Sequence, residues 1–283
     1  TGKDYIKAFG LPTSDILYAE CPHYWRYGHP DESESEYSNR LSDDLETLII
    51  REDPQTIAGF WAEPVIGAGG VIPPPVNYFK TIQTVLKKYQ IPMVIDEVIC
   101  GLGRTGSLWG CDTYDITPDI LITSKVLTGG YFPLAAVLLS KPIAEQLSNA
   151  CIEFEEFPHG FTTGGHPVGC AIGLKVLEIL LSDGLLEHVK EISKLFNENL
   201  AMLSSHNLVG ESRGVGLMGA LEIVADKQSK EPFPSNLDVT EKLANSAINQ
   251  GLIMRPLGQS IVLAPPFIIT EQQMVQLFDI LHS

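Results

Sequence analysis

A single lysine stands in a long uncharged stretch of the chain. Lys125 is the only charged residue between Asp119 and Lys141, and most of its neighbours are apolar. Removal from water favours the neutral form of an amine, and a fixed neutral lysine can form an imine with an aldehyde. The alternative is a lysine at a strand end whose ammonium group reaches water along its apolar stem. This segment alone leaves both interpretations open.

Two adjacent carboxylates lie inside a second apolar stretch. Residues 93–99, with the sequence M-V-I-D-E-V-I, are typical of a strand. Because side chains alternate along a strand, Asp96 and Val98 are expected on one face and Glu97 on the other. A carboxylate buried there needs a cation or strong hydrogen-bond donors. Asp96 could pair with a protonated ring nitrogen, with Val98 packed on the same ring, or both carboxylates could form structural ion pairs.

Three further patterns carry weaker indications. Residues 101–106 have the spacing of a dinucleotide-binding loop, but a poor helix follows, which favours a tight loop with a structural Arg104. Residues 159–167 place hydroxyl and N–H groups before a helix, which suits a phosphate or ordinary capping. Arg255 is a lone cation at the end of an apolar strand. It could hold a carboxylate through two hydrogen bonds or form a surface ion pair.

The composition limits the partners and the compartment. The 283 residues include 35 acidic and 19 basic side chains, and the net charge of −16 argues against nucleic acid or an anionic membrane as partner. The five cysteines show no C-x-x-C pair and no zinc-like spacing, which favours reduced thiols, a cytoplasmic location and no metal site. The apolar run at 120–140 contains lysine, proline and paired glycines, so we expect no membrane span.

Helical and strand patterns alternate in the first part of the chain. Helices are predicted at 38–51 and 75–89, and strands at 57–65, 91–99, 119–123 and 134–139. This alternation indicates an α/β fold with a mostly parallel sheet covered on both faces.

After about residue 165, helical patterns dominate. They run from 168 to 206 with a break at 182–184, and are followed by short strands at 217–224, 252–255 and 261–263 and by a final helix from about Glu271. The pattern predicts a smaller α+β domain that is joined to the first through a long helix.

The motifs occur together and in one order along the chain. They are E-P-V-I-G-A-G-G-V-I at 63–72, V-I-D-E-V-I-C-G-L-G-R-T-G at 94–106, the Lys125 segment, H-G-F-T-T-G-G-H-P at 159–167 and R-P-L-G-Q-S at 255–260. The series resembles the class III pyridoxal-phosphate aminotransferases and, within them, the amine–pyruvate (ω-) transaminases, over essentially the whole chain.

The resemblance implies a fold-type-I transferase that uses pyridoxal 5′-phosphate (PLP). Residues 1–167 would form the remainder of the large PLP-binding domain, with an incomplete sheet, and residues 168–283 the connecting helix and the small C-terminal domain. The enzyme would move an amino group from a primary amine or ω-amino acid to a keto acid such as pyruvate. Such enzymes act as homodimers, so we expect dimerisation of the intact protein.

The resemblance also implies a role for each candidate residue. Lys125 would form the Schiff base with PLP and then carry the proton. Asp96 would keep the pyridine nitrogen protonated, and Val98 would pack against the ring. Thr162 would reach the cofactor phosphate of the neighbouring subunit. Arg255 would bind the carboxylate of the keto acid and swing away for an amine without one.

One departure from many relatives concerns the donor. Aminotransferases for γ-amino acids tend to carry a glutamate five residues after the glutamate of the E-P motif, where it pairs with the carboxylate-binding arginine. In this chain the glutamate of the E-P motif is Glu63. The fifth residue after it, where those relatives carry the second glutamate, is Ala68. A free Arg255 beside a small Ala68 fits amine donors better than γ-aminobutyrate.

The second departure is in length. The resemblance implies well over a hundred further upstream residues, with a Gly/Ser-rich phosphate cup and an aromatic residue on the ring, so the chain looks N-terminally truncated. We expect it to be poorly soluble and weakly active when expressed alone. Three alternatives remain: a catalytically incompetent fragment, a class III PLP aminomutase or racemase, and a dinucleotide oxidoreductase that uses 101–106.

Overall fold

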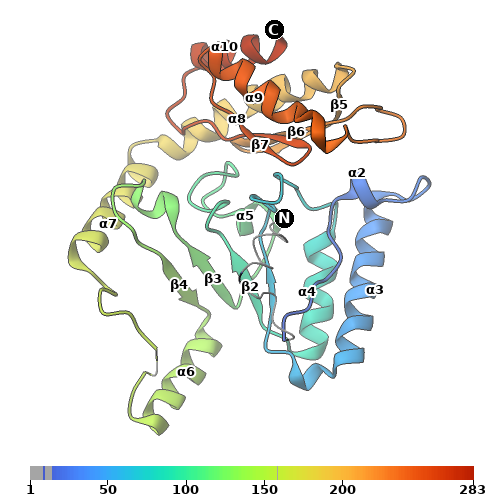
Figure 1. The fold of residues 1–283 in the computed structure, drawn as a ribbon. Helices are drawn as coiled ribbons and strands as arrows, with labels where there is room; N and C mark the ends of the chain where they lie inside the picture. Colours follow the sequence, from blue (N-terminus) through green and yellow to red (C-terminus); the bar gives the residue numbers. More distant parts are fainter. Residues whose placement is uncertain (1–8, 10–14, 158) are drawn as a thin grey trace.

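Two four-stranded sheets organise the molecule (Figure 1). The computed structural model describes residue 9, residues 15–157 and residues 159–283. The first sheet has the order β1-β2-β3-β4 and contains β1 (Phe60–Ala62), β2 (Met93–Asp96), β3 (Ile120–Thr123) and β4 (Ala136–Leu139). The second has the order β5-β6-β8-β7 and contains β5 (Val209–Val215), β6 (Met218–Ile223), β7 (Arg255–Leu257) and β8 (Ser260–Leu263).

Nine α-helices flank these sheets within the described residues. They are α2 (Tyr24–Tyr27), α3 (Glu34–Glu52), α4 (Tyr78–Tyr89), α5 (Gly110–Tyr114), α6 (Lys141–Phe154), α7 (Pro167–Ser182), α8 (Leu185–Met202), α9 (Val239–Asn249) and α10 (Glu271–His282). A 3-10 helix, η2 (Lys125–Thr128), follows β3. Among the described helices, none is long and apolar enough to cross a membrane.

The first sheet is parallel except at one edge. β1, β2 and β3 run parallel, with Ala62 beside Ile95 and Asp96 beside Ile122, and β4 pairs antiparallel to β3. The predicted mostly parallel sheet is therefore confirmed. Because the three parallel strands share a direction, their carboxyl ends meet at one edge, where ligands bind in open α/β sheets.

The two faces of this sheet are covered unequally. On one face, Ile95 packs in a buried cluster with residues of α3 and α4, among them Tyr37 and Phe79. On the other face, Trp61 and Val137 remain 64% and 61% exposed. The expectation of a sheet covered on both faces is wrong for the described residues, because no described helix lies over these two side chains.

The second sheet is built around α8. The apolar side of this helix packs onto β5, β6 and β8, with Phe196 fully buried. The predicted break at 182–184 separates α7 from α8. α7 begins at Pro167, with His166 Nδ1 accepting a hydrogen bond from the Val168 N–H at 3.2 Å. The division into domains 1–167 and 168–283 stays a prediction.

Several element boundaries differ from the prediction. The strand predicted at 91–99 ends at Asp96 because a turn starts there, and the strand predicted at 252–255 lies at 255–257. The sequence analysis missed β5, whose polar residues Glu211, Ser212 and Arg213 hide the alternation of a strand. It also missed α6 and α9.

Candidate active site

Three charged side chains gather at the carboxyl edge of the first sheet. Glu63 follows β1, Asp96 ends β2, and Lys125 lies two residues after β3. The register sets Glu63 beside Asp96, because Ala62 pairs with Ile95 in the parallel ladder. Glu63 interacts electrostatically with both Asp96 and Lys125. We call these three residues the strand-end cluster.

Asp96 and Glu97 have opposite surroundings, as alternation predicts. The Glu97 side chain is buried and accepts hydrogen bonds from the N–H groups of Gly110 at 2.9 Å and Cys111 at 2.7 Å, at the start of α5. Burial raises the pKa of Glu97 although these two donors act against the rise. Glu97 is therefore a structural cap of α5.

Asp96 is tied to Val98 by a turn rather than by strand alternation. Asp96 Oδ1 accepts a hydrogen bond from the Val98 N–H at 2.9 Å, which closes an Asx turn. Its Oδ2 accepts none from any described residue. The structure thus brings Asp96 and Val98 together, and it leaves one carboxylate oxygen of Asp96 for another donor.

Lys125 is exposed, so the interpretation of a lysine removed from water is wrong for this chain. It opens η2 with a left-handed φ of 47°, while Leu127 and Thr128 turn inward and are buried. Leu127 packs with Leu102 and Leu180, so the apolar neighbours form a core beneath the lysine and not around it. Lys125 forms no hydrogen bond or ion pair with any described residue. A left-handed non-glycine residue is strained, and such strain is concentrated at functional sites.

Glu63 is the site residue that the sequence analysis missed. Its Oε2 accepts a hydrogen bond from the Gly67 N–H at 2.9 Å. Burial raises the pKa of Glu63; the Gly67 N–H opposes the rise, the Asp96 charge adds to it, and the Lys125 charge opposes it. The sequence does contain a signal for Glu63, because an acidic residue directly follows the apolar strand 60–62. The sequence analysis used Glu63 only to locate Ala68.

Ala68 and Arg255 lie in two different regions of the molecule, one built around the first sheet and one around the second. Ala68 is exposed in the turn 67–70, which the Ile66–Ile72 bridge closes. Arg255 pairs with Val262, so both project from the same face of the second sheet. Val262 packs against a buried cluster that includes Val65 and Val71 from the chain around the turn, so this face of the second sheet is directed toward the turn. Arg255 is exposed and forms no hydrogen bond or ion pair within the described part of the chain.

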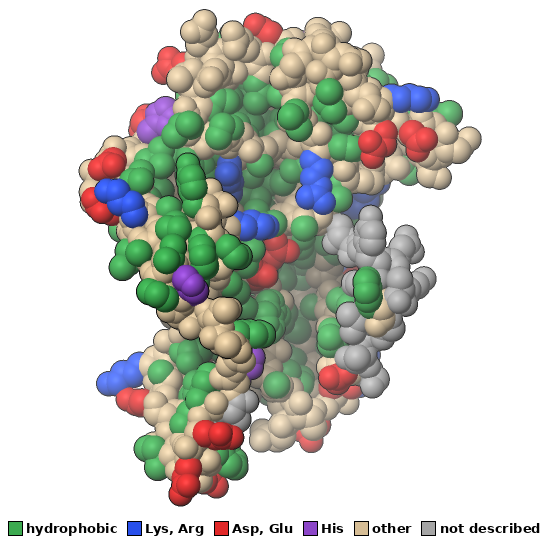
Figure 2. Space-filling view, turned by 60° about the vertical axis from the view of Figure 1, so that its left-hand side comes forward, with side chains coloured by type: hydrophobic (Ala, Val, Ile, Leu, Met, Phe, Trp, Pro, Cys, Tyr) green, Lys and Arg blue, Asp and Glu red, His purple; other side chains and the backbone are tan. Residues whose placement is uncertain are grey.

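The hollow between the two regions is visible in space-filling view. Figure 2 shows basic and acidic side chains at its border, below the second sheet. Thr162, by contrast, is exposed in the turn 162–165 before α7 and forms no hydrogen bond with a described residue. The structure does not join Thr162 to the strand-end cluster.

The loop at 101–106 contradicts the dinucleotide interpretation. The next helix, α5, starts only at Gly110, and Glu97 occupies its N-terminus. Arg104 donates hydrogen bonds to the carbonyl oxygens of Leu217 at 2.9 Å and Pro265 at 2.7 Å, and burial lowers its pKa to about 10. The loop is therefore a tight connection between the two regions, as its structural interpretation predicted.

The family model "Aminotransferase class-III" matches residues 4–283. The chain therefore belongs to the class III aminotransferase family. Solved structures of this family confirm the expected fold-type-I α/β architecture. The PMP-bound form of an aminotransferase from Vibrio fluvialis is 54% identical, with a TM-score of 0.97, over 100% of this chain and 62% of that chain. An ω-aminotransferase from Paracoccus denitrificans is 53% identical, with a TM-score of 0.97, over 100% of this chain and 63% of that chain.

A curated relative is named for a different substrate, γ-aminobutyrate. A probable γ-aminobutyrate transaminase 3, described as mitochondrial, from Oryza sativa subsp. indica is 43% identical over 96% of this chain and 53% of its own length. The chain thus spans about half the length of this relative and less than two thirds of the solved structures.

Proposed function

We propose that the protein transfers an amino group from a primary amine or ω-amino acid to a keto acid such as pyruvate, with PLP as cofactor. The observation that carries this proposal is the position of Lys125 and Asp96 at the carboxyl ends of two adjacent parallel strands, β3 and β2. The amine of Lys125 has no hydrogen bond with the described residues, and one oxygen of Asp96 is equally free. An amine and a carboxylate with unused capacity suit the aldehyde and the ring nitrogen of PLP.

Each residue of the site would make one contribution. When bound, PLP supplies an aldehyde and an aromatic ring that takes up electrons. Lys125 would hold the aldehyde carbon and move a proton with its amine. Asp96 would hold the proton on the ring nitrogen, and Val98 would pack on the ring. Thr162 of a partner subunit would donate to the phosphate, which suits its exposure in one chain.

We infer an amine donor rather than γ-aminobutyrate. Arg255 has no acidic partner among the described residues, and the facing turn presents the methyl group of Ala68. Arg255 would bind the keto-acid carboxylate through two hydrogen bonds and leave the site open for a donor without one. The name of the rice relative supports the second candidate, a γ-aminobutyrate donor. The ratio of kcat/KM for benzylamine and γ-aminobutyrate distinguishes the two.

The protein would work as a homodimer. Apolar side chains gather on the side of α6 and α7, as Figure 2 shows, and they remain exposed in one chain. These residues include Ile152 (76%), Phe154 (65%), Phe161 (79%) and Leu174 (70%). A patch of this kind marks an interaction surface. The cytoplasmic location stays a prediction.

Borohydride reduction of the PLP-loaded protein tests the central assignment. We expect reduction to fix the cofactor on Lys125, with a mass increment on the peptide that contains residues 120–140. Trapping on another lysine, or none, contradicts the proposal. Transfer of the amino group to pyruvate separates an aminotransferase from an aminomutase or racemase, because only the first converts added pyruvate into alanine. Trapping without turnover would indicate a catalytically incompetent fragment.

A further inference from the structure

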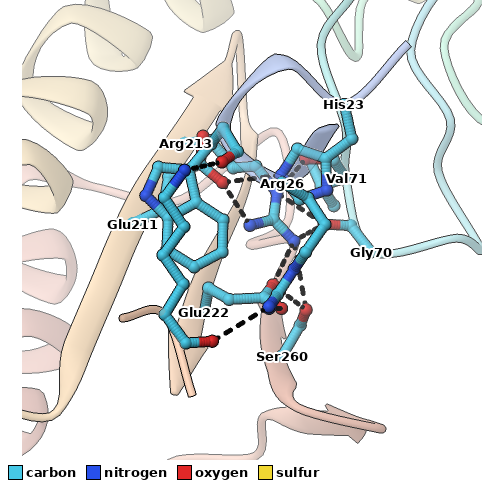
Figure 3. A network of polar contacts seen from close by, with 10 residues as sticks. His23, Arg26, Gly70, Val71, Glu211, Arg213, Glu222 and Ser260 are labelled. Carbon is cyan, nitrogen blue, oxygen red and sulfur yellow. Dashed lines mark hydrogen bonds and ion pairs between the residues drawn. The ribbon is translucent and has the colours of Figure 1, made fainter. Parts of the chain in front are cut away.

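A buried arginine joins the two regions of the molecule. Arg213 of β5 is 8% exposed and reaches across to the turn 67–70 (Figure 3). Its Nη2 donates to Gly70 O at 2.8 Å, and its Nε donates to Gly70 O at 3.1 Å and Val71 O at 3.0 Å. Two carbonyl groups at the end of the turn are therefore satisfied by one guanidinium group.

Acidic and hydroxyl groups fix the orientation of that guanidinium. Nη1 donates to Glu211 Oε2 at 2.7 Å, and Nη2 donates to Glu222 Oε2 at 2.9 Å and Ser260 Oγ at 3.0 Å. Ser260 in turn donates to Glu222 Oε2 at 2.7 Å. His23 and Arg26 complete the set, the former with Glu211 at 2.8 Å and the latter with Glu222 at 2.7 Å. We call these six residues the Arg213 network.

The charges of the network are matched. Burial alone would raise the pKa of Glu222, but Arg213, Ser260 and Arg26 outweigh burial and hold this pKa below its usual value. Because all three nitrogens of Arg213 have partners, the side chain has one favourable orientation. The carbonyl groups of Gly70 and Val71 are thus held in one place relative to β5.

The turn 67–70 is held at both ends. Glu63 accepts from the Gly67 N–H at its start, and Arg213 donates to the Gly70 and Val71 carbonyls at its end. Gly70 has a φ of 119°, and a Cβ there would lie 3.2 Å from Arg213 Nη2, so glycine is needed for the approach. Between these two anchors, Ala68 is exposed and Gly69 is half-buried.

The same network reaches the strand next to Arg255. Ser260 lies on β8, which pairs with β7 through Ser260–Leu257 and Val262–Arg255. A movement of the turn relative to β8 therefore changes the distance between Ala68 and Arg255. We propose that Arg213 is a positioning residue that sets donor specificity by fixing the turn 67–70 against the strand pair that carries Arg255. The inference rests on the proposed function.

The variants Arg213→Lys and Ser260→Ala test this role, with Arg104→Lys as the matched control. Arg104 is also a partly buried arginine that donates to two distant carbonyl groups, those of Leu217 and Pro265, but neither belongs to the turn. L-alanine, which carries a carboxylate, and benzylamine, which does not, serve as donors. We expect Arg213→Lys to raise KM for L-alanine about tenfold with little change in kcat. The kcat/KM of Arg213→Lys for benzylamine should stay within about twofold of that of the unaltered protein. Ser260→Ala should also raise KM for L-alanine, but by a smaller factor.

Hydrogen exchange provides a readout that needs no turnover. The N–H groups of Ile66, Gly67, Gly70, Val71 and Ile72 all donate hydrogen bonds within the turn or to Glu63. Their exchange should become about tenfold faster in Arg213→Lys and Ser260→Ala, and remain unchanged in Arg104→Lys.

Three results would contradict the proposed role of Arg213 or the function on which it rests. Equal losses for both donors in Arg213→Lys, or an equal effect of Arg104→Lys, would overturn the specificity role. Unchanged exchange across 66–72 would overturn the anchoring of the turn. Absence of turnover with either donor in the unaltered protein would contradict the proposed function, and the specificity role with it. If Arg213→Lys does not fold, the same comparison is made with Ser260→Ala, which removes a single hydroxyl.

Discussion

The strand-end cluster and the Arg213 network use charged residues in opposite ways. In the network, every ionic group has a partner within 2.9 Å, and Arg213 and Glu222 are buried. In the cluster, Lys125 is exposed without a hydrogen bond to any described residue, and Asp96 uses one oxygen. Charges with saturated partners hold a scaffold, whereas charges with unused capacity mark the place for a ligand. The difference predicts that substitutions in the two regions affect different measurements.

The largest expected effect is on activity and falls in the strand-end cluster. Lys125→Ala should abolish borohydride trapping and lower kcat by about 10⁴-fold or more, because in the proposed function this amine would both hold the cofactor and move the proton. The melting temperature of the cofactor-free protein should change by less than about 1 °C, since the exposed side chain forms no hydrogen bond or ion pair with a described residue. Activity assays and thermal unfolding measure the two effects.

A matched lysine controls for the loss of charge. Lys141 has a side chain that is 86% exposed and forms only a long ion pair, at 3.7 Å, with Glu145. Lys141→Ala should leave trapping, kcat and melting temperature unaltered. A fall of several degrees in Lys125→Ala alone would mean that this lysine is structural, and the contrast between the two regions would fail.

The next effect is on stability and falls in the Arg213 network. Glu222→Ala removes the acid that Arg213 and Arg26 share. Arg26 then has no acidic partner in the network and Arg213 keeps only Glu211, so an excess positive charge stays in a largely buried place. We expect the free energy of unfolding to fall by about 3–5 kcal/mol. Urea unfolding measures this loss. Glu211→Ala should cost less, because the Glu211 side chain is 21% exposed and water can replace it. Equal losses would contradict the assignment of Glu222 as the buried centre.

Acid should reduce the contribution of Glu222. Its pKa is lowered in the folded protein, so its carboxylate contributes stability at neutral pH, above the pKa of the unfolded chain. That contribution is lost as the pH falls below about 4.3, the ordinary glutamate value, toward the folded pKa. The difference in stability between the unaltered protein and Glu222→Ala should therefore shrink in acid. A difference that does not depend on pH would contradict the charge argument.

The cluster could be predicted in part because its residues follow local patterns. Alternation in 93–99 separated Asp96 from Glu97, and the uncharged segment drew attention to Lys125. The exposure of Lys125 could not be predicted, because it depends on which distant residues cover the strand ends. The network was invisible, since it joins residues from 23 to 260 and its central strand lacks the alternation of apolar residues. Sequence patterns report an element and its face, but not the partners that tertiary packing supplies.

Glu97 and Asp96 show the same difference between structural and functional charges at a single strand end. Glu97→Ala leaves the Gly110 and Cys111 N–H groups without an acceptor in a buried place, and we expect a loss of about 2–3 kcal/mol. Asp96→Ala frees only the Val98 N–H, so the loss should stay below about 1 kcal/mol, while activity falls strongly. Urea unfolding and kcat give opposite rankings for the two variants. The same ranking in both measurements would contradict the separation of roles.

The smallest expected effect concerns Glu63, which belongs to the cluster and also anchors the turn. Its pKa is raised in the folded protein, chiefly by burial, so the folded state keeps a proton that the unfolded chain has lost. Stability attributable to Glu63 therefore falls as the pH rises from the ordinary value of about 4.3 through the folded pKa. Glu63→Gln removes the cost of burying a charged carboxylate and keeps an oxygen that can accept the hydrogen bond from the Gly67 N–H. It should raise the melting temperature by about 2 °C at pH 7.5 and by nothing at pH 4.

The double variant, in which Glu63→Gln is combined with Lys125→Ala, tests whether the charges of the cluster are coupled. Lys125 is the cation that lowers the pKa of Glu63, and Asp96 raises it. Without Lys125 the penalty on the Glu63 carboxylate grows, so Glu63→Gln should stabilise Lys125→Ala more than it stabilises the unaltered protein. The exposed Glu198→Gln serves as control and should stabilise neither. Additive effects of the two substitutions would mean that the strand-end charges do not act on one another, and the cluster would then be three separate residues at one sheet edge.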